Sequence, residues 1–236
     1  MRYTFVTLFE DLIRPYFQSS ILKRAVDENK IEIDFVNPRD FTHDRYKKVD
    51  DYQAGGGAGL VLKFDILDAS LESIIKESED AYFIFLTPVA KLFNQKDAIR
   101  VSKKDHIVFV CGRYEGFDER IVEKWADEVF SIGDFILTGG ELASLCLADA
   151  ISRNIDGVVG NSESIKNESF EEHLLQAPVF TKPNIFQKRS LNKEYLKGNH
   201  SKIHDLKGKM SELKTKYFRP DLYKKVKINR RINDEK

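Results

Sequence analysis

The residues best suited by type and spacing to form a ligand site are glycines that follow apolar runs. The stretch SIGDFILTGGE, residues 131–141, has Gly133 before the apolar bridge FIL and the pair Gly139 and Gly140 after it. Glycine takes positive φ without a steric cost, so each glycine marks a sharp turn or a close backbone approach. Two such turns around an apolar bridge indicate either a backbone pocket with an apolar wall or a tight strand-to-helix connection.

Two earlier apolar runs end in the same kind of residue. HIVFV (106–110) breaks into CGRYEG, and AYFIFL (81–86) breaks into Thr87 and Pro88. Ligands of open parallel sheets bind outside the carboxyl ends of the strands, so the three ends predict one crevice. CGRYEG has only GxxxG spacing and no lysine follows it, which leaves both a Rossmann fingerprint and a Walker loop unsupported.

Alternating strands and helices must position these turns. Residues 3–8 and 31–36 are typical of strands, with apolar residues at helical spacing between Leu12 and Val26. Further helices are predicted around 67–75, over 95–101 and from Asp118, a good helix cap, to Trp125. The pattern predicts an α/β fold with a largely parallel sheet.

Between Pro38 and Gly59 this alternation stops. The segment is charged and then glycine-rich, and a loop of this length inside a compact domain suggests function. Its cations could face phosphates, while Asp50 and the other aspartates could orient them or keep the loop solvated.

The net charge of zero hides a division along the chain. Residues 1–181 carry 21 Lys and Arg against 32 Asp and Glu, and residues 182–236 carry 17 against 6, which gives −11 and +11. A basic segment of this kind indicates either binding to a polyphosphate backbone or a lysine-rich tail that docks onto the acidic part. Lysine-rich helices are predicted over about 199–217 and 221–226, after a polar, linker-like stretch at 154–169.

Other features narrow the class of protein. No segment has the eighteen or so uncharged apolar residues that cross a bilayer, and no signal peptide opens the chain, so a cytoplasmic protein is expected. Cys111 and Cys146 are expected to be reduced core thiols, and His200 and His204 to be surface residues and not metal ligands.

Four strings carry a resemblance to a known family. CGRYEGFDER (111–120), SIGDFILTGGEL (131–142), PRDFTHDRYKKVDD (38–51) and KGNH (197–200) resemble, in order and spacing, the bacterial tRNA guanine-N(1)-methyltransferases of the TrmD type. That family is a branch of the SPOUT methyltransferases, and the resemblance spans nearly the whole chain. Departures occur at Val89 and Ala90, at Ala143, and at Asp205 and Leu206.

The resemblance implies a fold and an activity. It implies a SPOUT-like α/β domain at 1–160 with a C-terminal trefoil knot, an interdomain linker at 161–173 and a basic, helical tRNA-binding domain at 174–236. It also implies a homodimer that transfers a methyl group from S-adenosylmethionine to N1 of the guanine immediately 3′ of the anticodon. The sequence leaves open a SPOUT-type enzyme for another RNA site and an inactive RNA-binding adaptor.

The resemblance assigns residues to both ligands. Backbone groups at glycine turns can grip an adenine edge without a phosphate-binding motif, which agrees with a cofactor pocket at the three strand ends. The expected cofactor-binding residues are Leu86, Thr87, Pro88, Gly112, Tyr114, Glu115, Gly116, Ile132, Gly133, Asp134, Phe135, Ile136, Leu137, Gly139 and Gly140. The expected tRNA-facing residues are Arg39, His43, Arg45, Asp50 and Gly59.

Catalysis requires a general base for the guanine proton and a cation near the guanine oxygen. By resemblance the base is Glu168, where the family has aspartate, and the cation is Arg153. Glu168 could instead cap a following helix, and Glu163, Glu171 and Glu172 are the next candidates for the base. The family also depends on magnesium, but no closed metal site is marked in the sequence.

Overall fold

The computed structural model describes residues 1–160, 168–170 and 174–234, with side chains described as far as residue 228. The chain divides into two compact units, residues 1–161 and residues 162–236. Each unit is described by itself.

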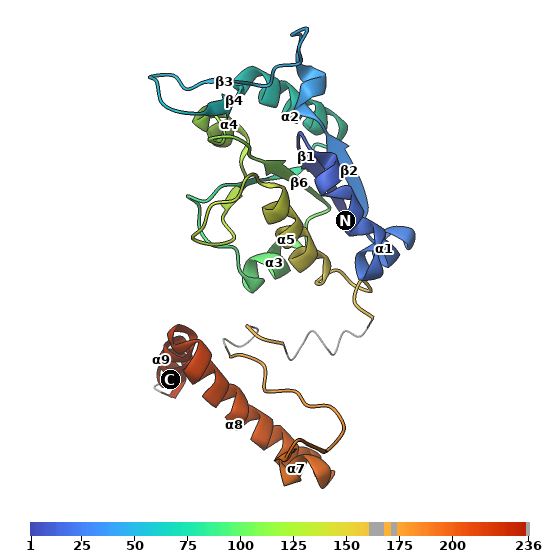
Figure 1. Ribbon diagram of the computed structural model, residues 1–236, viewed down its shortest axis with the longest axis vertical. Helices are drawn as coiled ribbons and strands as arrows, with labels where there is room; N and C mark the ends of the chain where they lie inside the picture. The colour runs from blue at the N-terminus through green and yellow to red at the C-terminus, as the bar shows by residue number, and fades with distance from the viewer. Residues whose placement is uncertain (161–167, 171–173, 235–236) are drawn as a thin grey trace. The chain divides into compact units, whose positions relative to one another are not determined.

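A five-stranded sheet forms the centre of the first unit (Figure 1). Its strands are β1 (Arg2–Val6), β2 (Glu32–Val36), β5 (Tyr82–Leu86), β6 (His106–Cys111) and β7 (Glu128–Phe130). They lie in the order β2-β1-β6-β5-β7, and every pairing is parallel. The prediction of an α/β unit with a largely parallel sheet is therefore confirmed.

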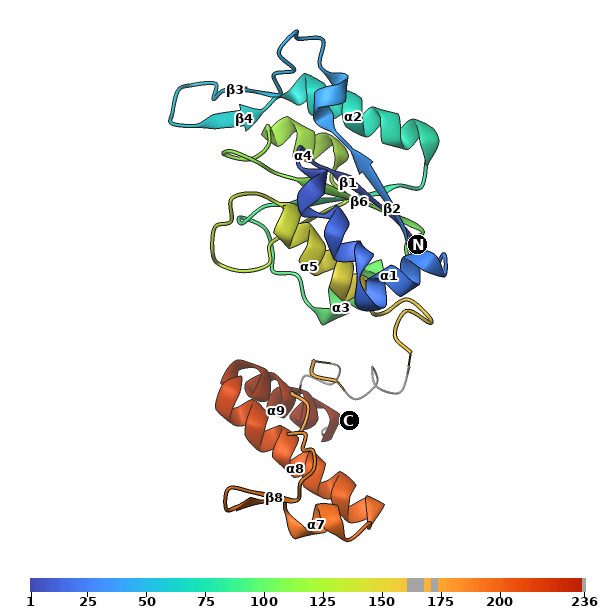
Figure 2. The ribbon, with the colours of Figure 1, turned by 45° about the vertical axis from the view of Figure 1, so that its right-hand side comes forward.

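Helices cover both faces of this sheet, as Figure 2 shows. The helices α1 (Ser20–Asp27), α3 (Gln95–Val101) and α5 (Glu141–Ser152) share one apolar cluster with one face. The helices α2 (Phe64–Glu77) and α4 (Glu119–Trp125) share a second cluster with the other face. Side chains alternate along β6, with Phe109 in the first cluster and Val110 in the second. Strands buried on both sides explain the continuous apolar runs of the sequence.

Two regions of the first unit differ from expectation. The apolar pattern from Leu12 to Val26 forms two 3-10 helices, η1 (Glu10–Leu12) and η2 (Arg14–Gln18), before α1, and Pro15 opens the second. Proline removes a backbone donor, which fits a first turn better than a helix interior. The segment at 38–59 holds η3 (Pro38–Phe41) and the strand β3 (Asp50–Tyr52), which pairs antiparallel with β4 (Leu60–Leu62).

The expected linker begins later than residue 154. Residues 154–160 follow α5 and pack on its cluster, with Val158 fully buried and Ile155 partly buried. Arg24 of α1 donates a hydrogen bond to the Val158 carbonyl at 3.2 Å. This stretch therefore belongs to the first unit, and residues 161–167 and 171–173 of the expected linker lie outside the described residues.

The second unit is mostly helical. It contains the short hairpin β8 (Ile185–Phe186) and β9 (Arg189–Ser190), then α7 (Lys193–Leu196), α8 (His200–Phe218) and α9 (Pro220–Asp234). The Asn199 side chain caps α8 by accepting from the Lys202 amide at 3.2 Å. The two lysine-rich helices predicted from the sequence are confirmed as α8 and α9. No helix in the described part of either unit is long and apolar enough to cross a membrane.

Candidate functional site

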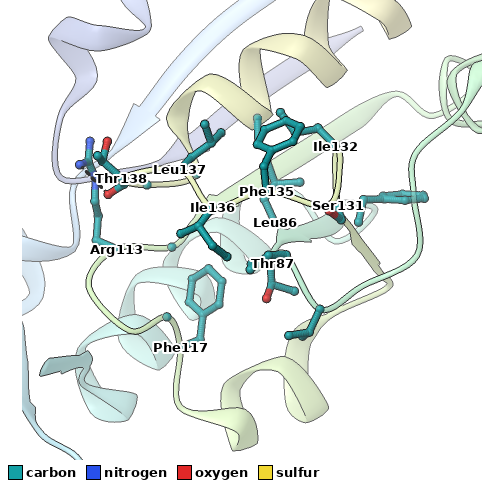
Figure 3. Close-up of a pocket in the computed structure, with 18 of the residues that line it drawn as sticks. Leu86, Thr87, Arg113, Phe117, Ser131, Ile132, Phe135, Ile136, Leu137 and Thr138 are labelled. Carbon is teal, nitrogen blue, oxygen red and sulfur yellow. Dashed lines mark hydrogen bonds between the residues drawn. The ribbon is translucent and has the colours of Figure 1, made fainter. Parts of the chain in front are cut away.

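A cavity of about 280 Å³ opens at the carboxyl ends of β5, β6 and β7 (Figure 3). Its first, second and third walls are the segments that follow β5, β6 and β7, respectively, and its lining is more apolar than polar. The residues that line it are Leu86, Thr87, Pro88, Val89, Gly112, Arg113, Tyr114, Glu115, Gly116, Phe117, Phe130, Ser131, Ile132, Gly133, Phe135, Ile136, Leu137, Thr138, Gly139, Gly140 and Ala143. The three strand ends do converge on one crevice.

Backbone hydrogen bonds hold the three walls to one another. The Gly140 amide donates to the Gly112 carbonyl at 2.8 Å, which joins the third wall to the second. The Thr87 amide donates to the Phe130 carbonyl at 3.1 Å, and the Phe93 amide to the Ser131 carbonyl at 2.9 Å, which joins the first wall to β7. The cavity is therefore bordered by fixed backbone rather than by loose loop ends.

Close approach explains the most restricted glycine. A Cβ on Gly140 would lie 2.8 Å from both the Cys111 Cα and the Gly112 amide nitrogen, so any side chain there would separate the two walls. In the second wall, Tyr114 has a φ of 59° and Gly116 a φ of 112°, which gives this turn its tight left-handed course.

Fourteen of the fifteen residues predicted to bind cofactor line this cavity. The exception is Asp134, which is exposed and is not among the lining residues. Sequence reasoning missed seven lining residues. Four of them, Arg113, Phe117, Ser131 and Thr138, lie within the recognised strings, and the other three are Val89, Phe130 and Ala143. The position of those four inside the motifs was the available signal, but glycine and strand-end patterns alone do not select them.

The segment expected to face tRNA packs against the second wall of the cavity. The Glu115 amide donates to the Leu60 carbonyl at 3.0 Å, and the Leu62 amide donates to the Gly116 carbonyl at 3.3 Å. Burial raises the pKa of Tyr114, and the nearby Asp50 carboxylate raises it further. Asp50 of β3 is thus brought to the pocket rim.

The other residues expected to face tRNA are less enclosed. Arg39 is half-buried and donates to the Lys47 carbonyl at 3.2 Å, whereas His43 and Arg45 are exposed. Gly59 has a φ of 89°, and a Cβ there would meet the Glu115 carboxylate. The structure therefore brings Asp50 and Gly59 to the second wall and leaves His43 and Arg45 on the surface.

The two residues expected to carry catalysis belong to different units. Arg153 is half-buried at the end of α5. Glu168 is half-buried in the second unit, next to Ser169, whose hydroxyl accepts from the Gln176 amide at 3.0 Å. Glu163, Glu171 and Glu172 lie outside the described residues.

The cysteines and acidic residues form no metal centre in the described part of the chain. No group of three or more His, Cys, Asp and Glu side chains there is arranged to hold an ion. Cys111 is buried, and burial raises the pKa of its thiol strongly. The expectation of two core thiols was wrong for Cys146, because its side chain is exposed on α5.

Comparisons with known proteins match nearly the whole chain, including the segments that line this cavity. Residues 1–225 match the family model described as tRNA (Guanine-1)-methyltransferase TrmD. A tRNA (guanine-N(1)-)-methyltransferase of Campylobacter curvus is 59% identical over 236 residues, covering 100% of both chains. Enzymes of the same name from Sulfurimonas denitrificans and Campylobacter jejuni are 57% and 56% identical, covering 94% of this chain and 96% and 97% of theirs.

Proposed function

The chain belongs to the TrmD family of tRNA (guanine-N1)-methyltransferases, and from this premise we propose a function for its cavity and for each of its two units. The protein transfers a methyl group from S-adenosylmethionine to N1 of the guanine immediately 3′ of the anticodon of tRNA. The cavity at the ends of β5, β6 and β7 holds the methyl donor.

One observation carries the proposed cofactor site. Residues from three separate strings of the sequence line a single cavity, and its walls are glycine turns and apolar side chains. Such walls suit a nucleoside with an uncharged ring edge, which backbone amides and carbonyls can bind while apolar side chains cover its faces. The absence of a side chain at Gly140 lets the second and third walls approach each other closely.

The chemistry divides between a few residues. S-adenosylmethionine supplies a methyl group on a sulfonium that is already activated. Glu168 takes the proton from the guanine nitrogen, and the Arg153 guanidinium stabilises negative charge at the guanine oxygen. The longer side chain of glutamate allows the same proton transfer as the aspartate of the family. Among the described residues, no group of three or more His, Cys, Asp and Glu side chains is arranged to hold a magnesium ion.

The fold proposed for the first unit is SPOUT-like, with a trefoil knot near its C-terminal end. The backbone hydrogen bonds between the walls of the cavity support this fold. The third wall is bonded to the second through Gly140 and Gly112, and the first wall is bonded to Ser131 of the third, so segments distant in the chain are interleaved around one cavity.

A homodimer with the active site at the subunit interface is proposed from an exposed apolar face. On η1 and η2, Leu12 is 55% exposed and Tyr16 44% exposed, and on α5 Leu142 is 59% exposed. The Tyr16 hydroxyl donates to Asp149 of α5 at 2.6 Å, which places η2 beside α5. A second copy of the chain would cover this face.

The second unit is proposed to bind the tRNA backbone. Its helices carry exposed lysines at 202, 207, 209, 216, 224, 225 and 227. This division of charge supports the domains proposed from the sequence, with S-adenosylmethionine bound by 1–160 and tRNA by 174–236 across a linker at 161–173. A tRNA substrate also supports the proposed cytoplasmic location.

Nucleoside analysis tests the proposal. The protein is incubated with S-adenosylmethionine and unmodified tRNA that has guanine 3′ of the anticodon, and the digested nucleosides are identified by mass. We expect 1-methylguanosine, and none with adenine at that position. Methylation of a ribose or of another base would show a SPOUT-type enzyme for a different site. Failure of S-adenosylmethionine to bind in calorimetry would show an RNA-binding adaptor.

A further inference from the structure

A buried ion pair lies directly behind the cavity. Glu141, the first residue of α5, is 2% exposed, and its Oε1 accepts hydrogen bonds from the Thr7 hydroxyl at 2.8 Å and from Arg113 Nε at 3.1 Å. Its Oε2 accepts no hydrogen bond from the described residues, but Arg113 Nη2 lies 3.0 Å away. The charge of this carboxylate is therefore balanced by the Arg113 guanidinium.

The same guanidinium reaches the wall of the cavity. Arg113 Nη1 donates to the Thr138 carbonyl at 3.1 Å, and Figure 3 shows the two residues together at one end of the pocket. Its Cζ lies over the Phe9 ring, 4.4 Å from the ring centroid. One planar group thus connects the ends of β1 and β6 to the start of α5 and to the turn before it.

The turn at 138–140 is shaped around this side chain. A Cβ on Gly139 would collide with Arg113 and would lie 2.6 Å from Glu141 Oε2, so the backbone passes as close to the ion pair as a glycine allows. The next residue, Gly140, donates to the Gly112 carbonyl. The course of the third wall is therefore set on one side by Arg113 and on the other by the backbone of the second wall.

We infer that Arg113 is a positioning residue, which fixes the 138–140 turn through Glu141 and the Thr138 carbonyl and so sets the affinity of the cavity for S-adenosylmethionine. This inference rests on the proposed function. It assigns Arg113 no contact with the transferred methyl group and no part in proton transfer.

The geometry requires arginine rather than lysine. The guanidinium presents several N–H groups in a rigid plane. Nε donates to Glu141 Oε1, Nη1 donates to the Thr138 carbonyl, and Nη2 lies 3.0 Å from Glu141 Oε2. A lysine ammonium is a single point at the end of a flexible chain, so it can keep the charge balance with Glu141 but cannot hold the Thr138 carbonyl as well. Arg113→Lys therefore separates the positioning role from compensation of the buried charge.

The test compares Arg113→Lys with a matched control, Arg120→Lys. Arg120 lies in the same segment after β6, is 72% exposed and pairs with Asp118 at 2.6 Å, away from the cavity lining. For Arg113→Lys we expect the Kd and KM for S-adenosylmethionine to rise about tenfold, the scale of one lost hydrogen bond. At saturating S-adenosylmethionine, kcat and the KM for tRNA should stay within about twofold. Arg120→Lys should change none of these values.

An unchanged affinity for S-adenosylmethionine in Arg113→Lys would overturn the inference, and so would a fall in kcat at saturation without a change in affinity. If Arg113→Lys does not unfold cooperatively, the affinity for S-adenosylmethionine is measured in Glu141→Gln instead. The glutamine keeps the shape of the side chain and an acceptor for the Thr7 hydroxyl, but its interaction with Arg113 is weaker because it has no charge. Weaker binding of S-adenosylmethionine by folded Glu141→Gln supports the inference, and wild-type binding contradicts it. Failure of the proposed cofactor site is distinct, because then the wild-type protein would not bind S-adenosylmethionine, and failure of the proposed substrate appears only in the nucleoside analysis.

Discussion

The two units of the chain are stabilised in different ways. The first unit has two apolar clusters with many fully buried side chains, such as Phe5, Leu71 and Phe109 at 0% exposure. In the described part of the second unit, the buried residues are Val226 and Thr215. Hydrogen bonds between the segment before the hairpin and α8 help to hold that unit together, such as the one from the Leu175 amide to the Thr215 hydroxyl at 2.8 Å.

This difference suits two kinds of ligand. A small ligand needs groups fixed to within a fraction of an ångström, which a cavity between packed strands provides. A polyanion needs a field of positive charge, which exposed lysines on two helices provide without a large core. The comparison therefore predicts that changes at the cavity of the first unit act mainly on S-adenosylmethionine, and that changes to the exposed lysines of α8 and α9 act mainly on tRNA.

The largest effect is expected from a change to Glu168, the proposed general base. Glu168 begins the described part of the second unit but is proposed to act on the reaction itself. Glu168→Gln should lower the single-turnover rate roughly a hundredfold to ten-thousandfold, because it removes the general base, with the affinity for S-adenosylmethionine unchanged. Glu168→Asp is the matched control and should stay active. Nearly full rate in the Gln variant at neutral pH would place the base elsewhere.

Removal of the basic segment tests the second unit. A chain that ends before Lys182 should bind tRNA at least about a hundredfold more weakly, because it loses 17 Lys and Arg residues. Its affinity for S-adenosylmethionine should change little. The comparison requires truncated protein that remains folded by circular dichroism, since the cut exposes apolar surface near Phe170. Equal loss of both ligands in folded protein would refute the division.

A side chain at Gly140 tests the first unit. Its Cβ would meet the backbone of Cys111 and Gly112, and forcing such atoms apart costs about 1–3 kcal/mol. Gly140→Ala should therefore weaken S-adenosylmethionine binding roughly tenfold to a hundredfold in calorimetry, with tRNA binding nearly unchanged. Gly208→Ala on α8, where nothing lies within 4 Å of the added Cβ, is the control. Wild-type affinity in Gly140→Ala would remove this turn from the site.

The smallest expected effect concerns pH. His106 is buried in the first unit, with Nε2 2.8 Å from the Thr4 hydroxyl and Nδ1 2.9 Å from the Ser78 hydroxyl. Burial lowers its pKa below the usual 6.5, and Arg2 lowers it further, while Asp34 and Glu77 oppose the shift. Below about pH 6.5 the unfolded chain therefore binds a proton that the folded chain does not. The free energy of unfolding consequently decreases as the pH is lowered below this value.

Urea unfolding at pH 7.5 and 5.5 measures this effect. His106→Gln should reduce the pH dependence of the unfolding free energy. The control is His204→Gln in the second unit, because the His204 side chain is 90% exposed, and it should leave the dependence as in the wild type. If His106→Gln also left the dependence unchanged, the buried histidine would not be its source.

Much of this organisation could be predicted from the sequence because the signals were local. The helix α3 follows the apolar spacing over 95–101, and Asp118 caps α4 by accepting from the Arg120 amide at 3.0 Å. The β3–β4 hairpin was missed, since its three-residue strands lie in a charged, glycine-rich segment and are held by the turn at 115–116. Arg113 was missed for a similar reason. Its partners Phe9, Thr138 and Glu141 are distant in the chain, and no spacing rule connects them to Arg113.

Salt dependence of the two affinities in the intact protein tests the division between the units most directly. If the second unit binds tRNA through six to ten phosphate contacts, the tRNA affinity should fall by roughly a thousandfold or more between about 50 and 200 mM salt. The affinity for S-adenosylmethionine, held by backbone and apolar walls, should change by less than about twofold. A tRNA affinity that stays flat over this range, or a cofactor affinity that falls in parallel with it, would contradict the account.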